Sequence, residues 1–165
     1  MAVALHLAAL LQKRPTVSQL WATLHGLPGG KVLFSKAVGR MAPYTGTIDC
    51  TVESLRAGHA VVSMADRKAV RNHLESVHAI ALMNLGEVST GLAVIFAIDG
   101  RGRGIITHLE MDYLKKARGT ITATCDATVP DGIGDHEFHA ESLLRDAEGA
   151  IVARARAIWK VSITG

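Results

Sequence analysis

Residues 77–98 read VHAIALMNLGEVSTGLAVIFAI, and Glu87 is the only ionisable side chain after Ala79 in this stretch. An apolar run of this length predicts a helix that is buried on most of its surface. A membrane span is the alternative, because about 20 apolar residues suffice to cross a bilayer. Asn84, Gly86 and Glu87 in the middle of the run argue against a span, since intramembrane carboxylates are costly. We therefore expect a core helix and no membrane span.

Strand-like segments lie on both sides of this helix. Alternating apolar and polar residues predict strands over 47–55 and 60–65 before it. β-Branched residues and intervening turn signals predict four more strands after it, over 105–114, 119–129, 137–145 and 150–163. Two strands, one apolar helix and four further strands indicate an α+β fold in which a single antiparallel sheet packs on one helix.

The beginning of the chain is expected to be helical. Two apolar stripes fall within residues 1–30 and are separated at Pro15: Leu5, Leu7, Leu10 and Leu11, then Leu20, Trp21 and Leu24. Residues 31–46 are predicted to be irregular, with a turn marked by Pro43 and Gly46. We therefore predict an N-terminal helical extension over residues 1–40 and the main domain over residues 41–165.

Composition limits the class of protein. With 48% hydrophobic residues, 20% charged residues and a net charge of +3, the chain is typical of a globular domain. The mild positive charge suits a phosphate-bearing ligand and falls short of a nucleic-acid-binding footprint.

Cys50 and Cys125 lie far apart with no metal-ligand spacing, so we expect no metal and a reducing, cytoplasmic environment. No basic residue precedes the opening apolar run, which argues against a secretory signal.

Glu87 is the residue that most needs an explanation. Burying an unpaired carboxylate costs several kcal/mol, so the group must be partnered, protonated or close to solvent. One interpretation is a structural core glutamate that is satisfied by a neighbouring hydroxyl, such as that of Ser89 or Thr90. The other is a carboxylate with a perturbed pKa in a cleft, which is a candidate for catalysis.

His78 opens the same helix, and Asn72 precedes it by six residues. A helix N-terminus offers free N–H groups and a positive dipole end, so it could bind an oxyanion that forms during a reaction. A simple capping role for His78 is the alternative. From position 78 to 87 a helix climbs roughly 13 Å and turns by about half a revolution. If both residues serve one site, a second copy of the chain must contribute to it, which predicts a symmetric dimer.

The run NHLESVHAIALMNLGE at 72–87 resembles the motif of hotdog-fold thioesterases, particularly the phenylacetyl-CoA (PaaI-like) branch. That branch has an Asn, a His six residues later, a Gly-Gly pair, and an acidic residue nine positions after the His. Residues 111–124, MDYLKKARGTITAT, look like the family's segment of a strand, a basic turn and the next strand. The resemblance covers roughly residues 40–163 and implies a hotdog fold, an antiparallel sheet wrapped around a long central helix.

The resemblance also implies roles. Glu87 would activate water or attack the thioester directly. The backbone N–H of Ala79 would bind the oxyanion, while His78 and Asn72 orient the carbonyl or the water. A second group of residues would contact the CoA phosphates, although a solvated turn is an equally good reading of each: Lys115, Lys116 and Arg118.

The resulting functional hypothesis is a cytoplasmic acyl-CoA thioesterase that works as a homodimer, with a dimer of dimers as the alternative assembly. Coenzyme A is then part of the substrate, and no separate cofactor is expected. Two alternatives stay open. A dehydratase or an acyl-carrier-protein thioesterase could use the same fold. A non-catalytic acyl-CoA-binding protein could have lost its chemistry where Ala79-Ile80 replaces the Gly-Gly pair.

Overall fold

The computed structural model describes residues 15–164. Four α-helices, one short 3-10 helix and six strands follow one another in these residues. In chain order they are α2 (Val17–Leu24), α3 (Gly30–Met41), α4 (Pro43–Gly46), β1 (Thr51–Arg56), β2 (His59–Met64), η1 (Lys68–Val70), α5 (Ala79–Ala97), β3 (Gly102–Tyr113), β4 (Ile121–Asp126), β5 (Gly134–Arg145) and β6 (Ile151–Ile163).

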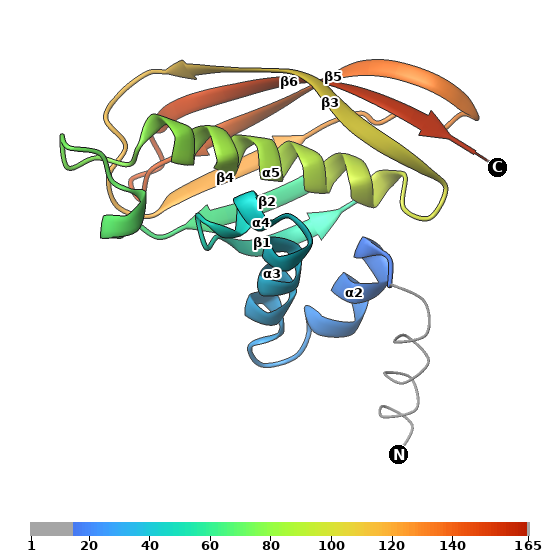
Figure 1. The fold of residues 1–165 in the computed structure, drawn as a ribbon, viewed down its shortest axis with the longest axis horizontal. Coiled ribbons are helices and arrows are strands. Elements are labelled where there is room, and N and C mark those ends of the chain that lie inside the picture. The colour runs from blue at the N-terminus through green and yellow to red at the C-terminus, as the bar shows by residue number, and fades with distance from the viewer. Residues whose placement is uncertain (1–14, 165) are drawn as a thin grey trace.

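The six strands form one antiparallel sheet in the order β1-β2-β4-β5-β6-β3. The sheet curves around α5, which lies along its concave face (Figure 1). The predicted α+β architecture, with two strands, a long helix and four strands, is confirmed. Strands β3 and β5 each begin earlier than predicted, at Gly102 and Gly134, because their glycines resemble turn signals in the sequence.

Helix α5 is seated deeply on the sheet. Leu85, Ala93 and Val94 have no exposed surface. A Cβ atom on Gly86 would lie only 2.6 Å from the Cβ of Ala155 on β6, so the helix backbone itself contacts the sheet. The helix is long and apolar enough to cross a bilayer, but 67% of its most apolar window is buried inside the molecule. This burial is typical of a core helix.

The prediction of irregular structure over 31–46 is wrong, because α3 and α4 occupy most of this range. Phe34 and Val38, one turn apart on α3, are both buried, and Trp21 of α2 packs edge-on against Phe34 with ring centroids 5.0 Å apart. The glycines and Pro43 of this segment suggested breaks in the sequence, whereas burial of one apolar face stabilises the helix.

The predicted second apolar stripe of the N-terminal region is confirmed as α2. Thr16 caps this helix and forms a capping box with Gln19. The first stripe, Leu5 to Leu11, lies outside the described residues. The division into an extension over 1–40 and a domain over 41–165 stays a prediction.

Candidate active site

The first turn of α5 is held by its own N-cap residue. The Nδ1 atom of His78 accepts a hydrogen bond from the backbone N–H of Ile80 at 3.1 Å. Nδ1 is therefore the acceptor nitrogen of the ring, and Nε2 has no hydrogen bond to residues 15–164. The capping role considered for His78 is present, and it leaves the second ring nitrogen available for a ligand.

A cavity of about 270 Å³ opens beside this turn. We call it the helix-start cavity. It brings together four residues that the sequence singled out, namely Asn72, Ala79, Lys115 and Lys116, and its remaining lining residues are Ser76, Val77, Leu82, Tyr113, Leu114 and Ala117. His78 faces a different, smaller cavity of about 180 Å³, which it shares with Tyr44, Arg71 and Asn84.

Asn72 shapes the loop that leads into α5. Its Oδ1 atom accepts hydrogen bonds from the backbone N–H groups of Leu74, at 2.9 Å, and Ser76, at 3.2 Å. Glu75, inside this turn, has a left-handed backbone with φ of 54°. The side-chain oxygen of Asn72 is thus engaged in the turn, while its Nδ2 atom has no hydrogen bond to residues 15–164 and is the group that could reach a ligand.

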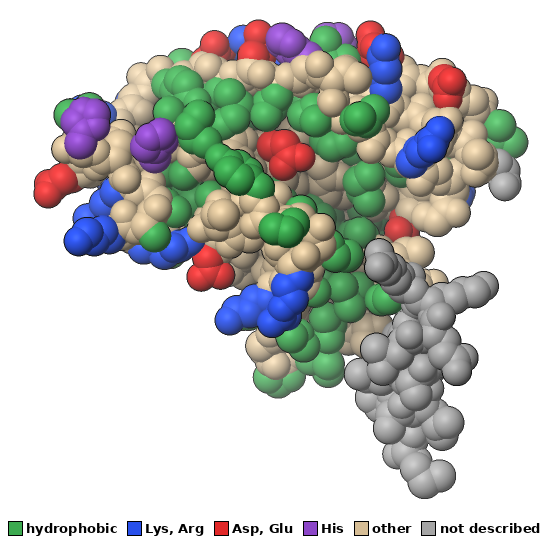
Figure 2. Space-filling view, viewed as in Figure 1, with side chains coloured by type: hydrophobic (Ala, Val, Ile, Leu, Met, Phe, Trp, Pro, Cys, Tyr) green, Lys and Arg blue, Asp and Glu red, His purple; other side chains and the backbone are tan. Residues whose placement is uncertain are grey.

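The three basic residues of the following turn are not equivalent. The Lys115 ammonium lies 2.6 Å from the buried carboxylate of Asp146, and this hydrogen bond lowers the pKa of Asp146. Arg118 donates to the carbonyl of Glu75 at 3.4 Å. Lys116 is exposed and has no ion pair within residues 15–164. Lys and Arg side chains gather at this end of the molecule, where α5 begins (Figure 2).

Glu87 lies in the middle of α5, on its partly open side. Burial raises the pKa of its carboxyl group above the usual value of 4.5. Its carboxylate has no hydrogen bond or ion pair to any residue in 15–164. A Cβ atom on Gly91 would lie 3.7 Å from Glu87 Oε1 and 3.4 Å from the Trp159 ring, which places the carboxylate close to Gly91 and to the side of the helix that faces Trp159.

The interpretation of Glu87 as a core residue satisfied by Ser89 or Thr90 is wrong. Ser89 Oγ lies 2.9 Å from the carbonyl of Gly86 and 2.7 Å from Ser142 Oγ. Thr90 donates to the backbone carbonyl of Glu87 at 3.0 Å, not to its carboxylate. Both hydroxyls serve the packing of helix against sheet, so the Glu87 side chain has no structural partner among residues 15–164.

Within one chain the candidate residues fall into separate groups. Asn72, Ala79 and Lys116 line the helix-start cavity, His78 faces the neighbouring cavity, and Glu87 lines neither of the two. About 13 Å of helix separate His78 from Glu87 at the usual rise per residue. A single chain therefore does not present the carboxylate to the first turn of its own helix.

Tyr113 is a site residue to which sequence reasoning assigned no role. It ends β3, and its hydroxyl donates to the carbonyl of Ala79 at 3.1 Å. Because His78 accepts the N–H of the same Ala79–Ile80 peptide, this peptide is held at both ends. Tyr113 lies in the basic segment that drew attention in the sequence, and its alternation with Met111 could have placed it on the helix side of the sheet.

Comparison with known proteins agrees with this architecture. No curated protein matches the chain. The structure of a protein described as genomics APC5556 superposes with a TM-score of 0.76 at 28% identity, over 90% of this chain and 98% of that one. PA5026 from Pseudomonas aeruginosa, described as a probable thioesterase, gives a TM-score of 0.67 at 20% identity, over 83% and 97%.

A mutant of the thioesterase SAV0944 from Staphylococcus aureus subsp. aureus Mu50 gives a TM-score of 0.64 at 18% identity, over 73% of this chain and 98% of that one. At such identities these two proteins share the fold with the chain. Residues 30–161 match the family described as Domain of unknown function (DUF4442). The chain therefore belongs to the DUF4442 family, and its fold is the hotdog fold that it shares with PA5026 and SAV0944.

Proposed function

We propose that this protein is an acyl-CoA thioesterase whose catalytic carboxylate is Glu87. The observation that carries the proposal is the state of this side chain: half-buried, with a raised pKa and with no partner in residues 15–164. Retaining such a group in a helix with no other ionisable side chain costs stability. A chemical role accounts for it, because a general base works best when its pKa lies closer to the operating pH.

In the proposed reaction, Glu87 takes a proton from water as the water oxygen adds to the thioester carbonyl. The carbonyl oxygen becomes negative and is stabilised by the N–H of Ala79 at the positive end of α5. When the tetrahedral intermediate collapses, the C–S bond breaks and the CoA thiolate recovers the proton from Glu87. Direct attack by the carboxylate, followed by hydrolysis of the resulting anhydride, is the other route open to the same residue.

His78, Asn72 and Tyr113 are assigned to positioning. His78 and Tyr113 hold the two ends of the Ala79–Ile80 peptide, and Asn72 holds the loop before it. Lys116 and Arg118 would contact the CoA phosphates at the mouth of the helix-start cavity, with Lys115 contributing its charge from the ion pair with Asp146.

The site is proposed to be completed by a second copy of the chain. The β1 edge of the sheet is packed by α3, whereas β3 at the other edge has no strand beside it among residues 15–164 (Figure 1). An open edge strand of this length favours pairing with another chain. The open side of α5 next to it carries Ile80, which is 50% exposed, along with Met83 and Glu87.

A two-fold axis beside β3 would extend the sheet and set the two α5 helices antiparallel. The open side of each helix would then be covered by the other protomer. The first turn of one helix would point toward the body of its partner, where Glu87 lies. This arrangement explains how residues that are separated within one chain can serve one substrate.

A thiol-release screen tests the activity. The purified protein, incubated with a panel of short, long and aromatic acyl-CoA esters and a thiol reagent, is expected to release CoA from at least one class of ester. An acyl-carrier-protein thioester serves as the comparison substrate. Binding of acyl-CoA without thiol release would identify a non-catalytic binding protein, and conversion of a 3-hydroxyacyl ester without thiol release would identify a dehydratase.

Reversing the charge of Lys116 with Lys116→Glu is expected to raise KM for acyl-CoA roughly tenfold, the effect of losing about 1.4 kcal/mol of binding. The value of kcat should change little, because phosphate contacts stabilise the ground state and transition state alike. The difference from wild type should shrink as ionic strength rises, since salt screens exposed charges. Steady-state kinetics at two salt concentrations measure both effects.

Arg56→Glu provides the matched control for Lys116→Glu. Arg56 is the exposed last residue of β1. It lies next to the turn to β2, where the Gly58 N–H donates to the carbonyl of Ala93 in the last turns of α5 at 3.1 Å. This is the end of the helix far from the helix-start cavity. An equal rise in KM for both variants would show that only the overall charge matters, and the phosphate site would have to be placed elsewhere.

A further inference from the structure

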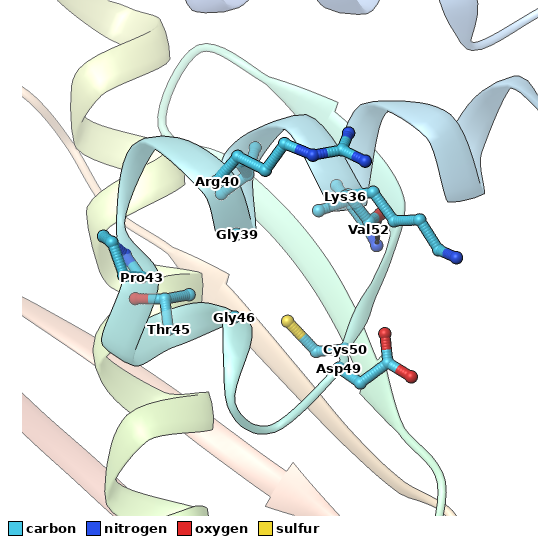
Figure 3. A pocket seen from close by; sticks show the side chains of 11 residues that line it. Lys36, Gly39, Arg40, Pro43, Thr45, Gly46, Asp49, Cys50 and Val52 are labelled. Carbon is cyan, nitrogen blue, oxygen red and sulfur yellow. Dashed lines mark hydrogen bonds between the residues drawn. The ribbon is translucent and has the colours of Figure 1, made fainter.

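A larger cavity, of about 490 Å³, lies outside the proposed active site. We call it the α3–β1 cavity, because its walls come from α3, from α4 and from the chain that enters β1 (Figure 3). Its volume falls within the range of about 300–1,000 Å³ that is usual for small-molecule sites. None of the residues assigned above to the thioesterase site lines it.

The inner wall of the α3–β1 cavity is apolar and closely packed, so its side chains cannot shift far enough to fill the cavity. Val38 and Val52, 7% and 1% exposed, form part of it. Gly39 of α3 and Gly46 of α4 are in direct backbone contact, since a Cβ on Gly39 would lie 2.9 Å from the Gly46 Cα. Because neither glycine can carry a side chain there, the hollow between α3 and β1 is not filled from that side.

Two cationic side chains lie at the mouth of the α3–β1 cavity. Lys36 and Arg40, one turn apart, extend from α3 along the same side of the cavity (Figure 3). Both are exposed, and neither has an ion pair or side-chain hydrogen bond within residues 15–164. Among residues 15–164, Asp49 is the only acidic residue that lines the cavity, and it forms no salt bridge to either cation. The mouth therefore keeps a net positive charge.

The polar side chains deeper in the wall are uncharged. Ser35 Oγ is occupied, because it donates to the carbonyl of Lys31 at 2.7 Å and accepts from the N–H of Val52 at 2.8 Å. The Cys50 thiol points from the chain before β1 into the cavity (Figure 3). An apolar interior below two unpaired cations matches a molecule with an apolar body and one anionic end.

We propose that the α3–β1 cavity binds an amphipathic monocarboxylate, with its apolar chain against Val38, Val52 and Cys50 and its carboxylate between Lys36 and Arg40. The site is separate from thioester hydrolysis. Helix α4 lies between the two regions, since its Tyr44 carbonyl accepts a hydrogen bond from Asn84 of α5 at 3.1 Å, one turn before Glu87.

Calorimetric titration with decanoate, below its micellar concentration, tests the proposal. Decanoate should bind, and decanol and decylammonium should each bind at least about tenfold more weakly, a difference of about 1.4 kcal/mol or more. Acetate, which has the charge but no chain, should give no measurable heat. The double variant Lys36→Gln, Arg40→Gln should weaken decanoate binding by about tenfold or more, while Lys31→Gln, on the same helix but outside the cavity, should not.

Cysteine modification locates the bound molecule without reference to activity. Burial raises the pKa of Cys50 to about 11 and that of Cys125 to about 12, so alkylation by iodoacetamide is slow and is best followed at pH 9 by mass spectrometry. Cys125 is fully buried and serves as the internal reference. Decanoate should slow the modification of Cys50 several-fold, and should not do so in the double variant.

Two results would overturn the proposal. Decanoate binding that survives the double variant and leaves Cys50 unprotected would place the fatty acid elsewhere, for example along the open side of α5. Binding of decylammonium that equals or exceeds that of decanoate would show that Asp49, not the two cations, sets the charge preference. The exposed positions of Lys36 and Arg40 mean that their substitution should leave the fold intact.

Discussion

Replacing Glu87 with glutamine is expected to lower kcat for thioester hydrolysis by on the order of 10²-fold or more, the usual effect of losing a general base. A neutral amide has nearly the same shape, but it cannot take a proton from water. The protein should remain folded, because burying a neutral amide costs less than burying a charge. Turnover and melting temperature, measured on the same preparation, separate the two effects.

Glu141→Gln is the matched control. Glu141 is an exposed residue on β5 whose side chain lies on the outer face of the sheet and pairs with Arg154 at 3.7 Å. This substitution should leave kcat unchanged. A folded Glu87→Gln protein with near-wild-type turnover would exclude Glu87 as base or nucleophile, and would favour a binding protein over a thioesterase.

The pH dependence of activity and of stability should also reflect the ionisation of Glu87. Because burial raises the pKa of Glu87 above 4.5, the active, charged form is lost at a higher pH than for an exposed glutamate. Activity should fall as pH drops through this raised pKa. The stability effect has the opposite sign: the folded state favours the protonated form, so folding is weakened as pH rises through the pKa. Glu87→Gln should remove that pH dependence of the melting temperature.

Mixing two inactive proteins, Glu87→Ala and His78→Ala, is expected to restore thioesterase activity to about a quarter of the wild-type level. If chains exchange at random, about half of the dimers are mixed, and each mixed dimer contains one site with both residues intact. Each parent alone should be nearly inactive. The measurement is thiol release as a function of time after mixing, compared with chain exchange followed by mass spectrometry or fluorescence transfer.

His78 also caps α5, so His78→Ala removes a cap whose loss typically costs about 0.5–2 kcal/mol. His78→Asn is the second variant, since it keeps an N-cap acceptor while removing the imidazole. Recovery with either variant supports a site shared between protomers. If exchange is complete and neither mixture recovers activity, Glu87 and His78 do not act together across an interface.

The fold could be predicted from the sequence mainly because one element dominates it. A helix formed by the long apolar run at 77–98 must bury most of its surface, and the alternating segments around it form the sheet. The helix α3 was missed for the opposite reason. Its glycines and exposed lysines weaken the local signal, and the burial of Phe34 and Val38 that stabilises it depends on contacts with residues distant in sequence.

Less of the candidate site than of the fold could be predicted from the sequence. The resemblance of residues 72–87 and 111–124 to the family motif pointed to Asn72, Ala79 and Lys116, which the structure brings to one cavity. It could not reveal that Lys115 is held by Asp146, because the partner lies beyond two further strands. It also could not show that Ser89 and Thr90 turn away from the Glu87 carboxylate, since the direction of a hydroxyl on a helix is set by what packs there.

The contact between Gly86 and Ala155 has a consequence for how this protein can change over evolutionary time. Even the alanine side chain at position 86 would overlap Ala155, so a larger residue would lift α5 away from the sheet and carry its neighbour Glu87 outward with it. The depth of the helix on the sheet therefore depends on small residues at positions 86 and 155. Gly86 and Ala155 take no part in the proposed reaction. They nevertheless limit which sequences can keep the Glu87 carboxylate in its present position relative to the sheet.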